Sequence, residues 1–167
     1  MSDIFIKSIY IQAQMHDVGM IYVPSETLRK TGEVTYDEWE TIKKHPIYGA
    51  SILGDYPRFK IAKNIALTHH ENWDGSGYPN NLKGDKIPIE GRIARIADTY
   101  DTLRIHRLYK PAFDHNTAYK IITEGDKKLK PEFFDPNILT SFKEIASEFE
   151  EIYEKLKDQN RREALIE

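Results

Sequence analysis

Hydrophobic residues along this chain recur at the spacing of helices rather than at the alternation typical of strands. Near the N-terminus, one helix face that follows the i, i+3, i+4, i+7 pattern is marked by Ile6, Ile9, Tyr10 and Ala13. One further turn brings this face to His16 and Asp17. The pattern predicts a partly buried helix that ends at or near this pair, although segment 4–11 is also rich in β-branched residues, which favour strands.

Capping residues and a proline mark the next predicted helix. Thr35 and Glu38 have the spacing of a capping box, in which two side chains bind backbone N–H groups at a helix start. The helix is predicted to continue through Trp39 to His45. Pro46 then kinks or restarts it, because proline lacks the N–H that a helix interior requires.

A third predicted helix leads into the longest irregular segment of the chain. Its apolar positions include Ile61 and Ile65, and it ends at the adjacent histidines His69 and His70. Residues 71–88 are rich in glycine, asparagine and proline and follow no helical or strand period. Long irregular segments commonly carry function, so we expect this loop to border a site.

Helical spacing returns in the second half of the chain. A helix with apolar positions at Ile89, Ile93, Ile96 and Tyr100 contains Asp98 and places Arg92 and Arg95 on another side. Asp135 and Pro136 are a good cap and first-turn pair. They are predicted to open one long helix marked by Leu139, Phe142, Ala146, Phe149, Tyr153 and Leu156.

These elements predict an all-α protein, a helical bundle with a long loop. The 167 residues are most simply one domain, 1–167, and 40% hydrophobic with 31% charged residues is ordinary for a globular protein. The net charge of −3 provides no basic field for a nucleic-acid polymer. We find no internal repeat and no low-complexity segment.

Two absences narrow the chemistry and the location. The chain has no cysteine, so any metal ligands must be histidine and carboxylate side chains, and a reducing compartment is compatible with this composition. No apolar run approaches the ~20 residues that a membrane span needs, and the N-terminus lacks the features of a signal peptide. We therefore expect a cytoplasmic protein without a membrane span.

Four of the six histidines and two aspartates form a candidate metal site: His16, Asp17, His45, His69, His70 and Asp98. Neutral imidazole and carboxylate groups suit divalent manganese, iron and zinc, and a carboxylate such as Asp17 or Asp98 can bridge two ions. Two such ions can activate water and stabilise the charge that develops when it attacks phosphorus. A single histidine is as often a packed side chain as a ligand, but two adjacent pairs on apolar-faced helices favour the metal site.

The motifs around these residues resemble the HD-GYP subgroup of HD-domain metal-dependent phosphohydrolases. The resemblance rests on four features in order: His16-Asp17, the following His45, the segment from His69 to Pro79, and Asp98 with Asp101. It covers nearly the whole chain from about Met15 onwards. It implies a helical fold that carries two or three iron or manganese ions and hydrolyses cyclic di-GMP to the linear dinucleotide or to GMP.

The resemblance also implies individual roles. Asp17 would bridge two ions, His45, His69 and His70 would bind one of them, and His16 and Asp98 would serve its neighbour. Arg107 and Lys110 resemble a basic stretch that holds substrate phosphate, a role that suits an arginine fork, although without the motif a solvated basic surface is an equal alternative. Asp17, Arg107 and Lys110 are thus the predicted catalytic residues.

The loop that names the subgroup is present as Gly77, Tyr78 and Pro79. By resemblance it would shape the mouth of the site and contact partner domains such as diguanylate cyclases. The alternative is a plain turn, because glycine and proline are ordinary turn residues. His106 and His115 lie beyond the motifs, and a surface role is expected for both.

The chain departs from the family pattern at two places. Met20 stands where the family has lysine, and a thioether supplies neither charge nor donors, so phosphate binding should weaken. The family's upstream helices, with a further glutamate and histidine ligand, have no counterpart in the fifteen residues before His16. We therefore expect two ions rather than three, and an uncovered face that predicts a homodimer, a partner domain or a missing N-terminal part.

Two alternatives to a cyclic di-GMP phosphodiesterase remain open at this point. Met20 and the short N-terminus are compatible with a catalytically inactive relative that acts as a nucleotide-binding or protein-interaction module. A phosphohydrolase for another nucleotide or phosphate ester is the third reading, because metal ligands fix the reaction more firmly than the substrate.

Overall fold

The computed structural model of the protein describes residues 1–105 and 112–163, with side chains through residue 157. All regular structure in these ranges is helical, which confirms the all-α prediction. The α-helices are α1 (Asp3–Gln12), α2 (Ser25–Leu28), α3 (Tyr36–Ile42), α4 (His45–Leu53), α5 (Lys60–Thr68), α6 (Ile89–Arg104), α7 (His115–Glu124), α8 (Pro136–Glu144) and α9 (Ala146–Glu163). Short 3₁₀ helices are η1 (Ala13–Met15), η2 (Val18–Tyr22), η3 (Pro57–Phe59), η4 (Gly84–Lys86) and η5 (Pro131–Phe133).

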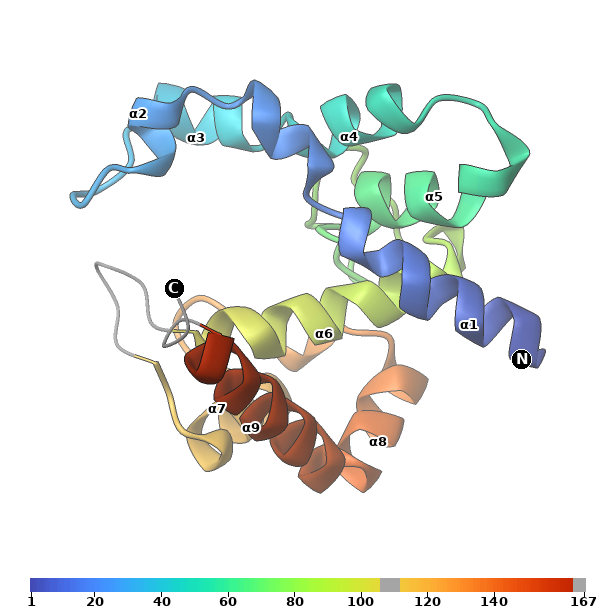
Figure 1. Ribbon diagram of the computed structural model, residues 1–167, viewed down its shortest axis with the longest axis vertical. Helices are drawn as coiled ribbons and strands as arrows, with labels where there is room; N and C mark the ends of the chain where they lie inside the picture. The colour runs from blue at the N-terminus through green and yellow to red at the C-terminus, as the bar shows by residue number, and fades with distance from the viewer. Residues whose placement is uncertain (106–111, 164–167) are drawn as a thin grey trace.

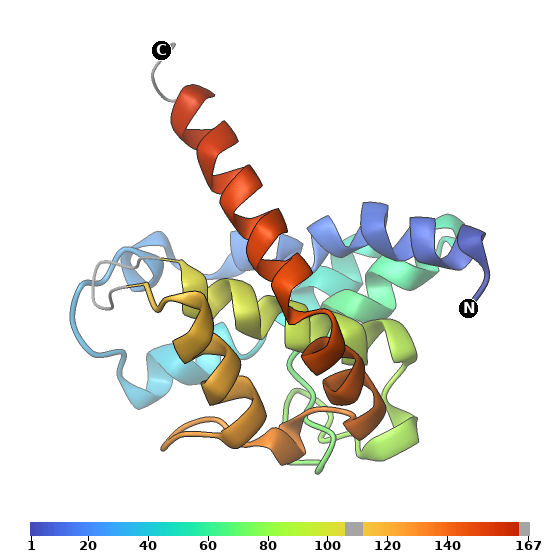
Figure 2. The same ribbon diagram turned by 90° about the horizontal axis from the view of Figure 1, so that it is seen from below.

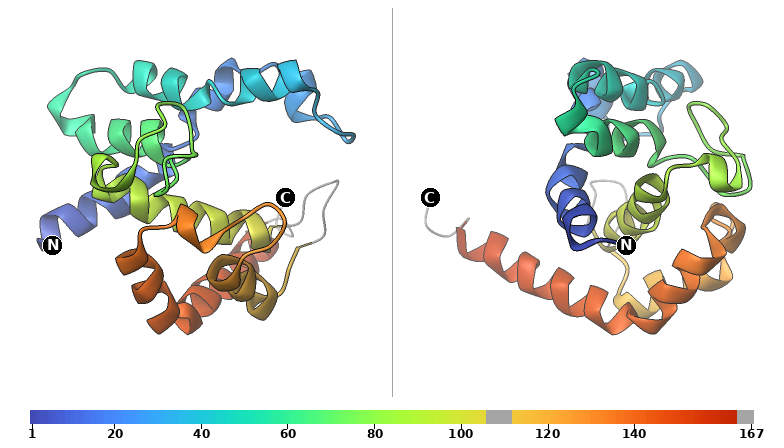
Figure 3. Two further views of the ribbon diagram at one scale, coloured as in Figure 1. Left: turned by 180° about the vertical axis from the view of Figure 1, so that it is seen from behind. Right: turned by 90° about the vertical axis from the view of Figure 1, so that its right-hand side faces the viewer.

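Helix α6 runs through the middle of the molecule and separates two groups of helices (Figure 1). Helices α4 and α5 pack together on one side, with α1 along α5 and η2 against α4. Helices α7 and α8 pack against α6 from the other side, and α9 projects away from them (Figure 2). The view from behind shows the same order, with the loop that follows α5 beside the start of α6 (Figure 3).

Two hydrophobic cores lie on either side of this central helix. The larger joins α6 to α7 and α8 and contains Ile96, Tyr100, Leu103, Ala118, Ile122, Phe134, Leu139 and Phe142. The smaller, between α4 and α5, contains Leu53, Ala62 and Ala66, with Met15, Val18 and Phe59 packed against it. Asp98 lies on α6 between the two cores, so packing on both sides fixes the helix that carries it.

Helix α1 packs by only part of the predicted face. Ile6 and Tyr10 of the predicted stripe are 51% and 78% exposed, whereas Ile9 and Ala13 are half-buried, and no residue of the helix is fully buried. Gln12, outside the stripe, is also half-buried, and its side-chain oxygen accepts the N–H of Ala62 at the start of α5. A polar contact that satisfies a free N–H of α5 therefore orients α1, which periodicity could not reveal.

The predicted helix starts are largely confirmed. Thr35 and Glu38 form the capping box at the start of α3. The helix ends at Ile42, and a new helix, α4, begins at His45 with Pro46 in its first turn, so the proline restarts the helix. The third predicted helix is α5, and His69 caps its C-terminal end.

The predicted long C-terminal helix is wrong, because it divides into α8 and α9. Asp135 caps α8 as expected, but Ile145 leaves helical geometry and ends it. Phe142 and Phe149 consequently meet edge to face at 5.0 Å, whereas in one straight helix they would be about 10.5 Å apart along the axis. Helix α7, which Asp114 caps, was missed in the sequence although the cap is readable there.

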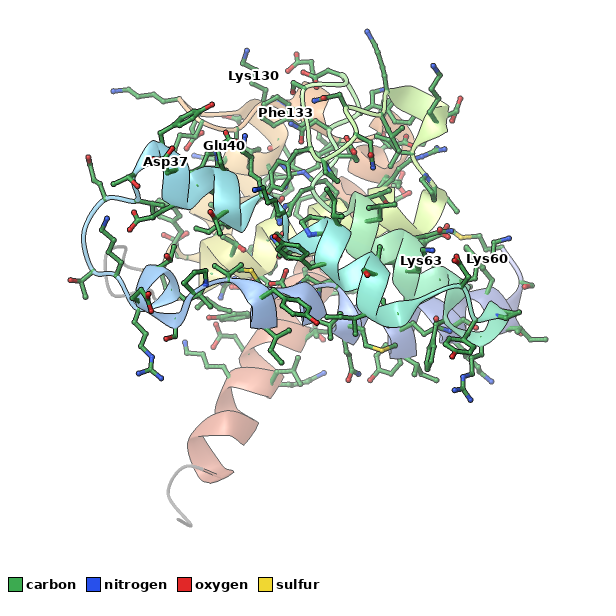
Figure 4. All side chains as sticks on the ribbon, turned by 90° about the horizontal axis from the view of Figure 1, so that it is seen from above. Asp37, Glu40, Lys60, Lys63, Lys130 and Phe133 are labelled. Carbon is green, nitrogen blue, oxygen red and sulfur yellow. The ribbon has the colours of Figure 1, made fainter. Side chains whose placement is uncertain are left out.

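Charge is distributed over the surface without a dominant sign. Lys60 and Lys63 lie at one end of the molecule, and Asp37 and Glu40 lie on α3 near the other, as the side-chain view shows (Figure 4). Among the described residues, none of the helices combines the length and apolar character that crossing a bilayer requires.

Candidate metal centre

Four separate segments bring the candidate ligands together. His16 ends η1 and Asp17 directly precedes η2. His45 is the first residue of α4, His69 and His70 follow α5, and Asp98 lies in the middle of α6. Most of these residues therefore lie at helix ends. Packing of the helices fixes their backbones, and their side chains project toward one another.

Asp17, His45, His69 and His70 form the tightest group. Each offers one ligand atom, and these atoms all lie within 4.8 Å of one another. Asp17 Oδ1 is 3.2 Å from His45 Nε2 and 3.5 Å from His69 Nε2. His45 and His69 are almost completely buried, whereas the Asp17 side chain is 47% exposed, so the group opens to solvent at the aspartate.

Hydrogen bonds to backbone carbonyls orient three of the imidazole rings. His45 Nδ1 lies 2.7 Å from the Ile42 oxygen, and His69 Nδ1 lies 3.0 Å from the Ile65 and Ala66 oxygens. His16 Nδ1 lies 2.9 Å from a carbonyl oxygen within η1. A carbonyl oxygen can only accept a hydrogen bond, so each Nδ1 is the donor. The other ring nitrogen, Nε2, is then the one that can bind a metal ion.

This arrangement fits a divalent cation. The Nε2 atoms of His45 and His69 lie 3.2 Å apart, and both face the Asp17 carboxylate. When both Nε2 atoms are unprotonated, their lone pairs repel each other at this distance, and a cation between them and the Asp17 carboxylate removes that repulsion. Two imidazoles and a carboxylate are donors that manganese, iron and zinc accept.

The electrostatics of Asp17 and His70 support the same conclusion. Burial raises the pKa of Asp17, but contacts with His45, His69 and His16 outweigh it and hold the pKa well below its usual range. Burial, with the nearby His69, His45 and Arg95, lowers the pKa of His70 well below its usual value. At neutral pH the carboxylate is therefore charged and the His70 ring neutral, as metal ligands must be.

His16 and Asp98 lie beside this group rather than within it. His16 Nε2 is 3.6 Å from Asp17 Oδ2 and 3.9 Å from Asp98 Oδ1. The second oxygen of Asp17 thus faces His16, while its first oxygen faces His45 and His69. The two oxygens of Asp17 face different imidazole groups, and its role as a bridge between two ions stays a prediction.

A cavity of about 300 Å³ opens directly over the cluster. Asp17, His45, His70 and Asp98 line its floor, and the remaining lining residues are Met20, Trp39, Ile42, Tyr78, Arg95, Thr99, Thr102, Leu103 and Leu129. A second cavity of about 470 Å³ lies against the loop and shares Trp39, His70, Tyr78 and Arg95 with the first. Both volumes are in the range of small-molecule sites.

The glycine-tyrosine-proline loop forms part of the cavity wall. The Tyr78 ring stacks on His70 at 4.8 Å and meets Trp39 edge to face at 6.0 Å. Gly77 passes so close to the chain that a Cβ there would lie 2.2 Å from the Asn72 nitrogen. Gly77, Tyr78 and Pro79 thus line the cavity next to the cluster, and close packing at Gly77 leaves no room for a side chain there.

The buried Glu71 side chain binds the part of the loop that follows Pro79. It is 1% exposed, and its carboxylate accepts the backbone N–H groups of Asn80 at 2.7 Å and Leu82 at 2.9 Å. The loop is further tied to η5, where the Phe133 oxygen accepts the Trp73 N–H (Phe133 is labelled in Figure 4). Hydrogen bonds to backbone groups, from the Glu71 carboxylate and the Phe133 oxygen, thus help to fix the shape of this wall.

Replacing Glu71 with glutamine tests this role. The amide turns one acceptor into a donor that faces a backbone N–H, which costs about 1–3 kcal/mol. We expect the Asn80 and Leu82 amides to exchange with deuterium at least about tenfold faster, while Glu33→Gln on the exposed segment before α3 leaves them unchanged. Unaltered exchange in the Glu71 variant would show that the carboxylate does not hold the loop.

Trp39 and Arg95 line both cavities, although neither was predicted from the sequence to belong to the site. Trp39 was used only to mark a helix, and Arg95 was placed on another side of α6. The predicted phosphate-binding residues Arg107 and Lys110 lie outside the described residues, as does His106. His115 lies at the start of α7, and its Nδ1 is 2.9 Å from the Tyr100 hydroxyl, away from the cluster.

These features define a class of protein. It is an all-helical domain in which histidine and aspartate side chains gather at helix ends as a candidate metal centre. The sequence pattern of the family described as the HD domain matches residues 1–138. The chain therefore belongs to the HD-domain family, a family that binds divalent metal ions, and the structure has a histidine and aspartate cluster that could hold such an ion.

Named relatives agree with this membership. The chain is 42% identical over 161 residues to a cyclic di-GMP phosphodiesterase of Vibrio cholerae, matching 92% of this chain and 32% of the relative. It is 36% identical over 162 residues to a cyclic di-GMP phosphodiesterase of Thermotoga maritima, matching 96% of this chain and 43% of the relative. A 3′3′-cGAMP-specific phosphodiesterase 2 of Vibrio cholerae is 43% identical over 124 residues, 72% of this chain and 24% of its own length. The chain thus spans less than half the length of each of these relatives.

Proposed function

We propose that the protein is a metal-dependent phosphodiesterase that hydrolyses cyclic di-GMP to the linear dinucleotide or to GMP. The observation that carries the proposal is the group of four ligand atoms within 4.8 Å of one another, opening into the cavity above it. The printed names of the first two relatives support the substrate. They also favour an enzyme over the inactive binding module.

The side chains of the chain would bind and orient both the metal and the phosphodiester. Hydrogen bonds from Nδ1 to the Ile42, Ile65 and Ala66 carbonyls orient His45 and His69 so that each Nε2 faces Asp17. Divalent ions held there would activate water and stabilise negative charge on the phosphate. Tyr78 covers His70, and the Trp39 ring at the rim offers a face on which a purine can stack.

Two ions, iron or manganese, are the proposed occupants. Asp17 would bridge them, with His45, His69 and His70 on one ion and His16 and Asp98 on the other. The separate directions of the two Asp17 oxygens, one toward His45 and one toward His16, support this division. Imidazole and carboxylate donors without any thiolate suit either metal.

Hydrolysis tests the proposal directly. Protein loaded anaerobically with Fe²⁺ or Mn²⁺ and analysed for metal is incubated with cyclic di-GMP, and products are separated by chromatography. Linear dinucleotide or GMP in proportion to bound metal is the expected result. Intact cyclic di-GMP with metal bound would favour the binding module, and hydrolysis of 3′3′-cGAMP alone would move the substrate to that of the third relative.

Met20 offers a separate prediction about the strength of this activity. It lines the cavity where the family has lysine, so Met20→Lys adds a cation beside the cluster. We expect cyclic di-GMP hydrolysis to rise by about tenfold at unchanged metal content, since a charged hydrogen bond contributes about 1.5–3 kcal/mol. Ile21→Lys, on the neighbouring exposed position, is the control for added charge. Equal rates in wild type and Met20→Lys would show that position 20 does not limit the reaction.

Several sequence predictions stay predictions here. They are the phosphate-binding roles of Arg107 and Lys110, a diguanylate cyclase or regulatory domain as partner of the Gly77-Tyr78-Pro79 loop, a homodimer, and the cytoplasmic location. The exposed residues of α1, such as Ile4 and Tyr10, agree with a partner on that face without identifying it.

A further inference from the structure

Arg95 lies on the wall of both cavities beside the metal cluster. It precedes Asp98 by three residues on α6, so the two side chains project from neighbouring positions of one helix face. It lines the first cavity together with His70 and Asp98 and the second together with Asn72 and Tyr78. A cation is therefore built into the wall that a bound phosphodiester would face.

Two hydrogen bonds hold this guanidinium in a fixed orientation. Arg95 Nε donates to Asn72 Oδ1 at 3.0 Å, and Nη1 donates to Thr99 Oγ1 at 2.7 Å. Asn72 is itself held, because its Nδ2 donates to Ser76 Oγ at 3.0 Å. The guanidinium also lies over the Phe134 ring, 5.6 Å from its centre. Its side-chain entropy is thus already lost before any ligand binds.

Arg95 forms no ion-pair contact with a carboxylate of the described residues, although the nearby Asp98 carboxylate raises its pKa in part against the effect of burial. Its helix neighbours are paired, Arg92 with Asp85 and Asp135, and Arg104 with Glu154. Across the two described ranges, no carboxylate oxygen lies within the 4.0 Å of an ion pair with Arg95. Two of its five N–H groups are used, and burial lowers its pKa, which is the effect expected of a desolvated cation. A held and unpaired guanidinium at a cavity wall favours an anionic ligand.

We propose that Arg95 binds a non-bridging phosphate oxygen of the substrate and supplies a phosphate-binding cation that Met20 does not provide. The inference rests on the proposed function, because it takes the occupant of the cavity to be a phosphodiester. Met20 and Arg95 line the same cavity from η2 and α6, so a ligand over the cluster lies between the two elements. The arginine fork suits phosphate oxygens better than a single point charge does.

Binding of products tests this role without turnover. Calorimetric titration of the metal-loaded protein uses GMP, inorganic phosphate and guanosine as probes. Arg95→Met is expected to weaken GMP and phosphate binding by about tenfold or more, the loss of one charged hydrogen bond, and to leave guanosine binding unchanged. Arg58→Met is the matched control, since Arg58 is exposed on η3 and the same charge is lost.

Two further variants separate phosphate binding from a structural role. Arg95→Lys keeps the charge but cannot make both bonds to Asn72 and Thr99, so phosphate binding should largely survive while a structural role would be lost. The double variant Met20→Lys with Arg95→Met returns a cation from the other wall and should recover affinity relative to Arg95→Met alone. Recovery, with metal content unchanged, is the result expected.

The proposal is overturned if Arg95→Met binds GMP and phosphate like wild type, or if guanosine binding falls with them, which would assign Arg95 to the base. It is also overturned if Arg95→Lys behaves like Arg95→Met and the double variant recovers nothing. Failure of the proposed function is separate, because it appears as intact cyclic di-GMP in the wild-type protein whatever the GMP titration gives.

Discussion

Replacing Asp17 with alanine is expected to remove bound metal and abolish hydrolysis of cyclic di-GMP. The carboxylate is the one negative group of the tight cluster, and its oxygens face His45 and His69 on one side and His16 on the other. Without it, only the three imidazoles of His45, His69 and His70 remain for the ion. We expect metal affinity to fall by more than about a hundredfold, measured by metal analysis after dialysis against a weak chelator.

Asp37→Ala is the matched control for this variant. Asp37 is an exposed aspartate of α3, visible at the surface in Figure 4, and its loss removes the same charge away from the cluster. Metal content and hydrolysis should equal those of wild type. Full metal content in the Asp17 variant would show that the centre does not depend on the proposed bridge.

Gly19 is expected to matter for metal binding nearly as much as Asp17 does, although it contributes no ligand. A Cβ there would lie 2.0 Å from the His45 carbonyl oxygen and 2.4 Å from the Gly49 nitrogen, both of which are backbone atoms. Gly19→Ala therefore pushes η2 away from α4, and with it Asp17 away from His45. We expect the free energy of unfolding to fall by about 3 kcal/mol and metal binding to weaken in the protein that remains folded.

Gly32→Ala provides the comparison for Gly19→Ala. A Cβ at Gly32 would meet no atom within 4 Å, so the same added methyl group should leave stability and metal binding unchanged. Chemical denaturation measures the first quantity and metal analysis the second. Wild-type stability in Gly19→Ala would mean that η2 and α4 are not pressed together as described.

Local signals in the sequence were sufficient for much of the fold and for the ligands. The capping box of Thr35 and Glu38, the restart at Pro46 and the cap at Asp135 depend on side chains within a few residues, and all three are present. Asp17, His45, His69 and His70 come together from helix ends, with His16 and Asp98 beside them, and the role of these six residues as metal ligands stays a prediction.

Features that depend on tertiary contacts could not be predicted from the sequence. The orientation of α1 depends on the contact of Gln12 with Ala62, and the break at Ile145 brings Phe142 and Phe149 together. Arg95 reads in the sequence as one more charged residue of a helix. Its role in the wall depends on Asn72 and Tyr78, which the loop brings back from more than fifteen residues away.

Anomalous diffraction from crystals of manganese-loaded protein tests the central claim most directly. The claim is that the cluster of Asp17, His45, His69 and His70 is the metal centre. We predict an anomalous peak bonded to His45 Nε2, His69 Nε2 and an Asp17 oxygen, with a second peak beside His16 and Asp98 if two ions bind. A manganese-loaded crystal whose anomalous peaks all lie elsewhere would contradict the claim.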